Sequence, residues 1–130
     1  MPFDLAALFI AAAERELGGT LPASYVAAMR ASNGGELAVL DDDWDQYPIA
    51  DLSDRKRLSR TANHVIKETQ ALLQWPRFPK QGLAIAGNGA GDQLVLLKDG
   101  PDFAESVYHW SHESGALTKV ADAFSELSAS

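Results

Sequence analysis

The 130-residue sequence predicts a single α+β domain, with an antiparallel meander of strands and helices at both ends. Two observations lead to this prediction. The length is that of one domain. Apolar residues recur at helical spacing near both termini, while short apolar runs bounded by Gly, Asn, Asp and Pro occupy much of the region between them. Helices at both ends of an antiparallel sheet are typical of the α+β class.

Two helices are expected at the N-terminal end. In residues 3–17 the apolar positions are three or four apart, Asp4 can cap the start, and a Gly-Gly pair follows. Residues 21–37, LPASYVAAMRASNGGEL, predict a second helix. Pro22 suits its first turn, because the N–H that proline lacks would be unpaired there. The Asn-Gly pair near its end tolerates the left-handed backbone that closes a helix.

The middle of the chain is expected to hold short strands and a third helix. Residues 37–40 form a short apolar run that ends at an acidic loop, residues 41–45. Residues 47–50 predict a short edge strand, a position that proline tolerates. Residues 59–73 have an apolar face at helical spacing, and two prolines within residues 75–79 end that helix.

Three more strands and a last helix complete the expected fold. Residues 82–86 and 93–97 are apolar runs of strand length on either side of a glycine-rich segment. Residues 106–110 are expected to form another strand, with Val107 and His109 on one face and Tyr108 and Trp110 on the other. Residues 119–127 carry apolar side chains at helical spacing, so we expect a closing helix there.

The glycine-rich segment, IAGNGAGDQLVLL, raises the question of a phosphate-binding loop. A dinucleotide fingerprint needs a third glycine and then a helix. Gly87 and Gly89 fit, but the third position holds Asp92 and a strand pattern follows. A P-loop is also excluded, because no Gly-Lys-Ser/Thr occurs. The glycines therefore predict a hairpin turn in which at least one of Gly87, Gly89 and Gly91 has a positive φ.

The charge is unevenly distributed. Residues 55–80 carry seven bases and one acid, a net charge of +6, so that a total of −7 leaves −13 on the rest of the chain. Six acids and no base lie between Asp41 and Asp54. Such a stretch repels nucleic-acid phosphates and attracts basic proteins, although acidic runs are often solvated loops.

Metal, cofactor and catalytic sites are not indicated. Without cysteine there is no disulfide, zinc–thiolate site or cysteine nucleophile. His109 and His112 would face opposite sides of a strand, so they would share a ligand only if the strand ended between them. An EF-hand starting at Asp41 fails, because Gln46 and Leu52 stand where glycine and glutamate are needed. The longest apolar run, residues 5–13, is about half a membrane span and lacks a basic flank, so we expect a cytoplasmic protein.

Three segments together resemble the SUKH superfamily, the group around the yeast Smi/Knr cell-wall regulators and many bacterial immunity proteins. Residues 21–37 resemble its leucine-proline, aromatic, Asn-Gly-Gly signature. Gly89-Ala-Gly-Asp92 resembles the Gly-x-Gly-Asp that the family places between two apolar strands. Residues 107–113 and 121–127 are similar to its polar-ended strand and closing helix. The matches keep their order over residues 21–127, but residues 41–80 match no pattern of the family.

The resemblance implies a non-catalytic protein-binding module, most often an immunity protein that neutralises a toxin, frequently a nuclease. With the charge pattern it predicts a basic toxin domain as partner. The alternative is a regulatory or nucleic-acid-binding protein that uses residues 55–80. Trp44 is expected either to anchor a partner or to pack over the sheet. The residues expected to contact the partner are Asp41, Asp42, Asp43, Trp44 and Asp45, together with Asp92.

Overall fold

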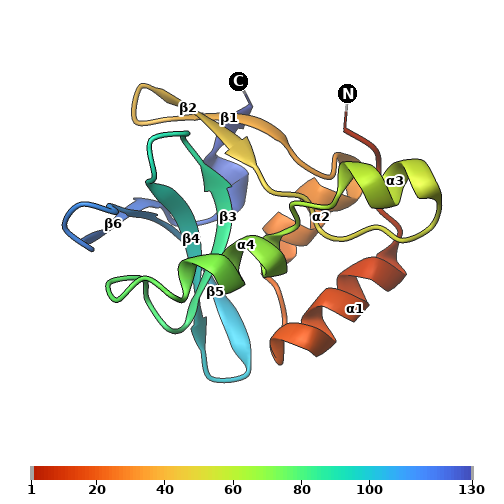
Figure 1. Ribbon diagram of the computed structural model, residues 1–130, viewed down its shortest axis with the longest axis horizontal. Helices are drawn as coiled ribbons and strands as arrows, with labels where there is room; N and C mark the ends of the chain where they lie inside the picture. Colours follow the sequence, from red (N-terminus) through yellow and green to blue (C-terminus); the bar gives the residue numbers. More distant parts are fainter. Residues whose placement is uncertain (1, 130) are drawn as a thin grey trace.

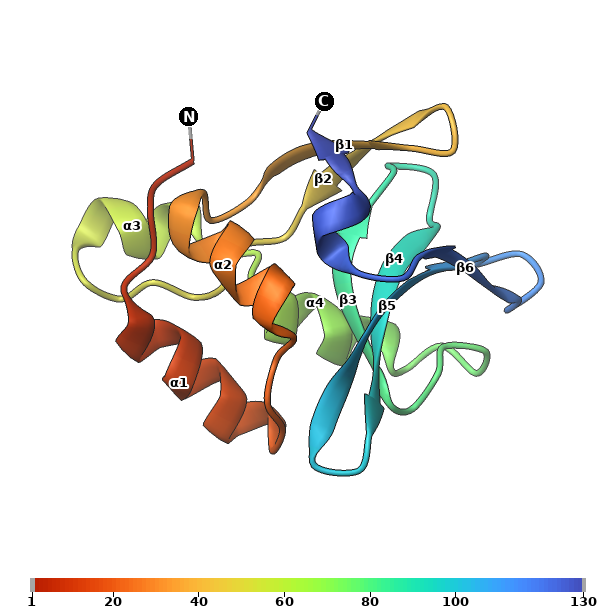
Figure 2. The ribbon, with the colours of Figure 1, turned by 180° about the vertical axis from the view of Figure 1, so that it is seen from behind.

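A computed structural model describes residues 2–129, and within that range the chain forms one antiparallel sheet with helices packed against it (Figures 1 and 2). The α+β prediction is confirmed. The helices are α1 (Ala7–Leu17), α2 (Ala23–Ala31), α3 (Arg55–Arg60), α4 (Val65–Leu72) and the 3₁₀ segment η1 (Phe124–Glu126). The strands are β1 (Gly35–Val39), β2 (Asp42–Gln46), β3 (Gly82–Gly87), β4 (Gln93–Asp99), β5 (Asp102–Trp110), β6 (Leu117–Ala121) and β7 (Ser128–Ala129).

The sheet is a meander whose last strand returns to the first. Among the described residues the strand order is β6-β5-β4-β3-β2-β1-β7, and every neighbouring pair is antiparallel. Short β7 pairs with Leu37 and Ala38 of β1, so the C-terminal end of the chain lies beside the N-terminal half of the sheet. In Figure 2, α2 and η1 lie in front of the sheet, and α4 lies behind β3.

The centre of the sheet is buried on both faces. All six residues of β3 are buried, which explains why this strand is continuously apolar in sequence and does not alternate. On one face, Leu83 and Ile85 join the larger core with Tyr25 and Met29 of α2. On the other, Ala84 of β3 lies in a smaller cluster around Trp110, whose ring meets that of Phe78 edge to face. Helix α4 adds a polar contact to β3, since Thr69 Oγ1 accepts a hydrogen bond from the Ala84 N–H at 2.9 Å.

The first helix is shorter than predicted. α1 begins at Ala7, and its N-cap, Ala6, makes no capping bond through its side chain, so the expected cap by Asp4 is wrong. The chain before it is fixed by other contacts: the Leu5 N–H donates to the Arg30 carbonyl, and the Asp4 carboxylate accepts from Arg57. The end was predicted correctly, because Gly18 closes the helix with φ of 69°.

The single helix predicted over residues 59–73 is wrong at its start: residues 59–60 are the end of α3, which begins at Arg55, and a separate helix, α4, covers Val65–Leu72. Each starts at a side chain that accepts a hydrogen bond from a backbone N–H of the first turn. Asp54 caps α3 by accepting from the Arg57 N–H, and His64 caps α4 by accepting from the Lys67 N–H. The spacing of the apolar residues does not reveal these caps, so the sequence pattern alone predicts one continuous helix.

The closing helix predicted over residues 119–127 is wrong. This segment holds the end of strand β6, which pairs with β5, and then only the short 3₁₀ segment η1. Phe124 is nevertheless buried, and its ring meets that of Tyr25 edge to face with centroids 5.1 Å apart. The helical spacing therefore identified a residue that faces the core, Phe124, but the backbone of this segment is a strand end and a 3₁₀ turn and not an α-helix.

The acidic loop and the strand after it were also assigned wrongly. Residues 41–45 are not a loop, because β2 runs through most of them. The segment predicted as a strand, residues 47–50, has no strand assignment. Its backbone is bonded instead by the Asn33 side chain, which donates to the Ile49 carbonyl and accepts from the Ile49 N–H, both at 2.8 Å.

Candidate functional site

The predicted contact residues lie on a two-stranded hairpin formed by β1, β2 and their turn, which we call the acidic hairpin (residues 35–46). Its strands alternate between two faces. Leu37 lies opposite Trp44, and both are buried in the core. Glu36 lies opposite Asp45 and is, like it, exposed. Two carboxylates directly opposite each other repel, so this face is electrostatically unfavourable by itself.

The turn at the tip of the acidic hairpin has an unusual sequence. Val39 pairs with Asp42, so Leu40 and Asp41 are the two central residues of the turn. Their φ angles are 54° and 59°, the left-handed conformation that two-residue hairpins require and that Asn-Gly normally supplies. Asp tolerates this conformation, but a leucine pays a steric cost. Leu40 is also 62% exposed, an apolar side chain that three aspartates follow in the sequence.

Trp44 holds the acidic hairpin onto the rest of the sheet. It is 1% exposed, and its indole N–H donates to the Val39 carbonyl at 3.0 Å. Its ring meets that of His109 edge to face, with centroids 5.7 Å apart. The expectation that Trp44 is a surface anchor is therefore wrong, and the alternative, that its ring packs against the sheet, holds.

Asp92 fixes two histidines beside the acidic hairpin. His109 Nε2 lies 2.9 Å from one carboxylate oxygen, and His112 Nδ1 lies 2.6 Å from the other, which also accepts from the His112 backbone N–H. Both histidines reach one partner because β5 ends at Trp110, between them. Burial raises the pKa of Asp92, but the hydrogen bonds from His112 and His109 outweigh it, so the pKa is lowered overall. Within residues 2–129, no group of three or more His, Asp or Glu side chains is placed to hold a metal ion.

The glycine-rich segment is the turn between antiparallel strands β3 and β4, as predicted. Gly89 and Gly91 have φ of 82° and 110°. Gly91 also makes room for the histidine ring, because a Cβ there would lie 2.9 Å from His112 Cγ. Asn88 joins this turn to the acidic hairpin, since its side-chain amide donates to Asp42 Oδ2 at 3.1 Å. Asp42 and Asp92 thus come from neighbouring turns of one end of the sheet.

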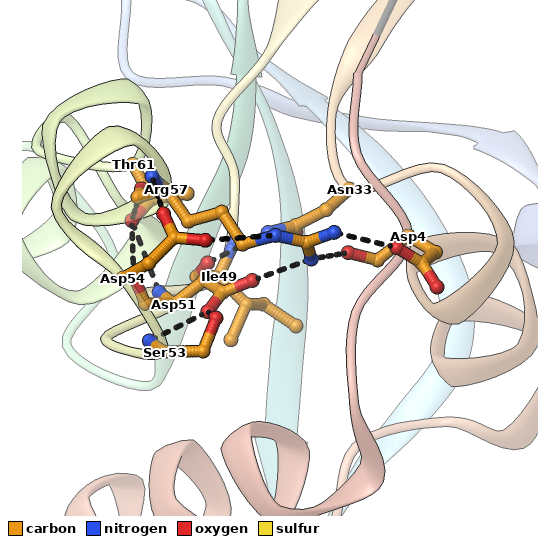
Figure 3. A network of polar contacts seen from close by, with 8 residues as sticks. All are labelled: Asp4, Asn33, Ile49, Asp51, Ser53, Asp54, Arg57 and Thr61. Atoms are coloured by element: carbon orange, nitrogen blue, oxygen red, sulfur yellow. Dashed lines mark hydrogen bonds and ion pairs between the residues drawn. The ribbon is translucent and has the colours of Figure 1, made fainter.

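Within the basic stretch, Arg57 has an internal role. Its guanidinium pairs with Asp4 at 3.0 Å and Asp51 at 3.1 Å, and more distantly with Asp54 at 3.9 Å (Figure 3). The Asp51 side chain is 2% exposed. Burial raises the pKa of Asp51, whereas hydrogen bonds from Ser53 and Arg57 lower it more, so the carboxylate is held ionised. Sequence reasoning missed this network, because Asp4 lies 53 residues from Arg57 and no local pattern connects them.

Comparison with known proteins identifies a family for this α+β chain. No curated protein matches the sequence. No helix within the described part of the chain is both long and apolar enough to cross a membrane. The family model described as "SMI1 / KNR4 family (SUKH-1)" matches residues 6–130, nearly the whole length of the sequence. Members of this family are generally binding modules and not enzymes. The chain belongs to the SMI1 / KNR4 family (SUKH-1).

Proposed function

We propose that this chain is an immunity protein that binds and neutralises a basic toxin domain stoichiometrically, without catalysis, and that the acidic hairpin is its contact surface. Membership of the SMI1 / KNR4 family supports a protein-binding role. The observation that carries the choice of surface is the exposure of Asp41, Asp42, Asp43 and Asp45 on one ordered hairpin. Asp92, beside them and 21% exposed, is a secondary contact.

The physical reason is charge complementarity. Acidic side chains crowded on a hairpin repel one another, and a basic surface would offset that repulsion when it docks. Because Trp44 is buried, the hairpin is attached firmly to the sheet and presents its carboxylates in a fixed arrangement. Pre-organised charge of this kind mainly raises the association rate and excludes wrong partners.

The test compares association kinetics of two variants with equal net charge. In the first, Asp41, Asp42, Asp43 and Asp45 are changed to Asn. In the control, four exposed acids elsewhere are changed to their amides: Glu16, Asp99, Asp102 and Glu113. Against the toxin domain encoded by a neighbouring gene, the hairpin variant should associate at least about tenfold more slowly than wild type at low salt, with a difference that shrinks as salt is added.

The control variant should lose much less, because its charges lie outside the contact surface. The hairpin variant should melt at the same temperature as wild type or slightly higher, since four mutually repelling charges are gone. Equal association rates for the two variants would show that the overall charge matters and the hairpin does not, and the contact surface would then have to be sought elsewhere.

The alternative, a nucleic-acid-binding protein, requires a common exposed basic face on residues 55–80. Arg57 does not fit this requirement, because its charge is offset by Asp4, Asp51 and Asp54. The geometry therefore does not favour that function.

A further inference from the structure

A cavity of about 300 Å³ lies between the N-terminal segment, the α2–β1 loop, the end of β2 and the α3–α4 region. It is built from several elements and stands apart from the tip of the acidic hairpin. One wall is fixed by the network of Figure 3, in which the Asn33 side chain is hydrogen-bonded to the Ile49 backbone and the Asp51 carboxylate is bonded to Arg57 and Ser53. The side chains that matter for its chemistry are Phe3, Gln46, Arg60 and Asn63.

Gln46 supplies a buried acceptor without a partner. Its side-chain N–H₂ donates to the Gly34 carbonyl at 3.0 Å, which fixes the orientation of the amide, because the flipped amide would set two oxygens against each other. The other atom, Oε1, is buried and has no hydrogen-bond partner among the described residues. A buried amide oxygen is normally bonded, so this atom is suited to a ligand that brings an N–H donor.

Arg60 supplies positive charge at the same cavity. Its guanidinium lies 5.1 Å from the centre of the Phe3 ring, and it has no ion pair with any of residues 2–129. The carboxylate that lines the cavity, Asp51, is already paired with Arg57. Asn63, also exposed, has a side-chain amide that is not hydrogen-bonded within the described chain and can donate or accept.

We propose that this cavity binds a carboxylate with a neighbouring N–H donor, the chemistry shared by a free amino acid and the C-terminal residue of a peptide. Arg60 pairs with the carboxylate, and Asn63 donates to a remaining oxygen. Gln46 Oε1, which is buried in the free protein, accepts from the N–H once the ligand displaces the atoms that cover it. A few polar groups that converge in a recess are the usual design of a small-ligand site, and the volume is at the small end of that class. This inference does not rest on the proposed toxin partner.

The test uses three probes: N-acetyl-alanyl-alanine with a free carboxylate, the same peptide as its C-terminal amide, and free alanine. Each is titrated into the ¹⁵N-labelled full-length protein, and backbone amide shifts are followed. The free-acid peptide should shift the resonances of Gly34, Gly35 and Asn63 saturably, and the amide should bind at least about tenfold more weakly because it lacks the charge-assisted bond. Saturable binding of alanine with equal affinity would identify a free amino acid as the ligand, and a preference for the peptide would identify a chain end.

Variants separate this site from general effects of charge. Arg60→Gln should weaken binding of the free-acid peptide about tenfold or more, and Asn63→Asp should weaken it too, since a carboxylate there repels the ligand. Asn63→Asp removes no existing hydrogen bond among the described residues, so its melting temperature should not change. Arg55→Gln is the matched control: it removes a positive charge from the same helix but does not line the cavity, and binding should be unchanged.

Three results would overturn the proposal. The first is equal binding of the acid and the amide. The second is unchanged binding in both Arg60→Gln and Asn63→Asp. The third is the absence of saturable shifts at Gly34, Gly35 and Asn63 up to about 10 mM of each probe, a concentration that detects even millimolar affinity.

Discussion

The hydroxyl of Tyr25 is fully buried and has no hydrogen-bond partner among the described residues, and its burial raises the pKa of the group. The ring itself packs well, edge to face on Phe124. Tyr25→Phe keeps this packing and removes only the unpaired group, so it should raise the free energy of unfolding by about 1 kcal/mol. Tyr47→Phe is the control, because the Tyr47 hydroxyl donates to Gln93 Oε1 at 2.8 Å and its loss should cost about 1 kcal/mol. Urea unfolding curves for both variants measure the difference, and equal losses would mean that the Tyr25 hydroxyl has a partner.

Asp92 should make stability depend on pH in the acid range. Its pKa is lowered in the folded protein relative to 3.8, so protonation favours the unfolded state. The stabilisation is therefore present above about pH 4 and is lost as the pH falls through the folded-state value. Asp92→Asn should be less stable than wild type at neutral pH and should lose less stability on acidification. Thermal melts across this range measure both slopes. Asp51, with a lowered pKa of its own, contributes to the slope that remains, and parallel slopes for wild type and Asp92→Asn would contradict the role of Asp92.

At the scale of elements, the turn of the acidic hairpin carries a conformational cost that one substitution should remove. Leu40 has φ of 54° and is exposed, so its side chain gains little burial in return for the strain. Leu40→Asn should raise the free energy of unfolding by about 1 kcal/mol, because asparagine adopts the left-handed conformation readily. Leu52→Asn is the control, since Leu52 is equally exposed, at 64%, but does not have a positive φ. Chemical unfolding compares the two, and an equal effect would show that loss of an exposed leucine is the cause and strain is not.

The elements that local patterns specify were predicted well, and those that depend on distant pairing were not. The β3–β4 hairpin was predicted because its apolar runs and its glycines act locally. Strand β2 was missed because four of its five residues are Asp or Gln, which are poor strand formers. It forms because β1 and β3 pair on its two sides and Trp44 is buried beneath it. Residues 119–127 failed for the same reason, since pairing of β6 with β5 outweighs a local helical spacing.

The candidate site shows the same division. The positions of the aspartates were read directly from the sequence, whereas their arrangement was not. The partnership of Asp92 with His109 and His112 spans 17 and 20 residues and depends on where β5 ends. The burial of Trp44 depends on its position opposite Leu37, a matter of strand register. Registers and strand ends arise from tertiary packing, so no single-sequence pattern contains them.

At the scale of the whole molecule, Arg57 connects segments that are far apart in the chain. It joins the N-terminal segment through Asp4, the loop before α3 through Asp51, and α3 itself (Figure 3). The N-terminal segment also donates and accepts backbone bonds, from the Leu5 N–H to Arg30 and from the Asn33 N–H to Phe3. Part of the apparent basic stretch is thus used to close the fold, and the rest is available at its surface.

This connection can be tested by removing the guanidinium and then its buried partner. Arg57→Gln should lower the melting temperature, because it leaves the Asp51 carboxylate, 2% exposed, without its cation. Hydrogen exchange of the Leu5 and Asn33 amides should speed up at the same time, since the N-terminal segment loses its side-chain attachment. Arg55→Gln removes the same charge from an exposed site of α3 and should change neither quantity.

The double variant Asp51→Asn with Arg57→Gln should recover much of the lost melting temperature, because no charge is then left buried. Its Leu5 amide should still exchange fast, because Asp4 still lacks its partner. Recovery of stability without recovery of protection would separate the two tasks of Arg57: neutralising a buried carboxylate and holding the N-terminal segment in place. If the double variant instead melted as low as Arg57→Gln alone, the buried charge would not be the cause of the lost stability. The contacts of Arg57 with Asp4 and with the Phe3 ring, whose centre lies 4.5 Å from the guanidinium carbon, would then account for the loss.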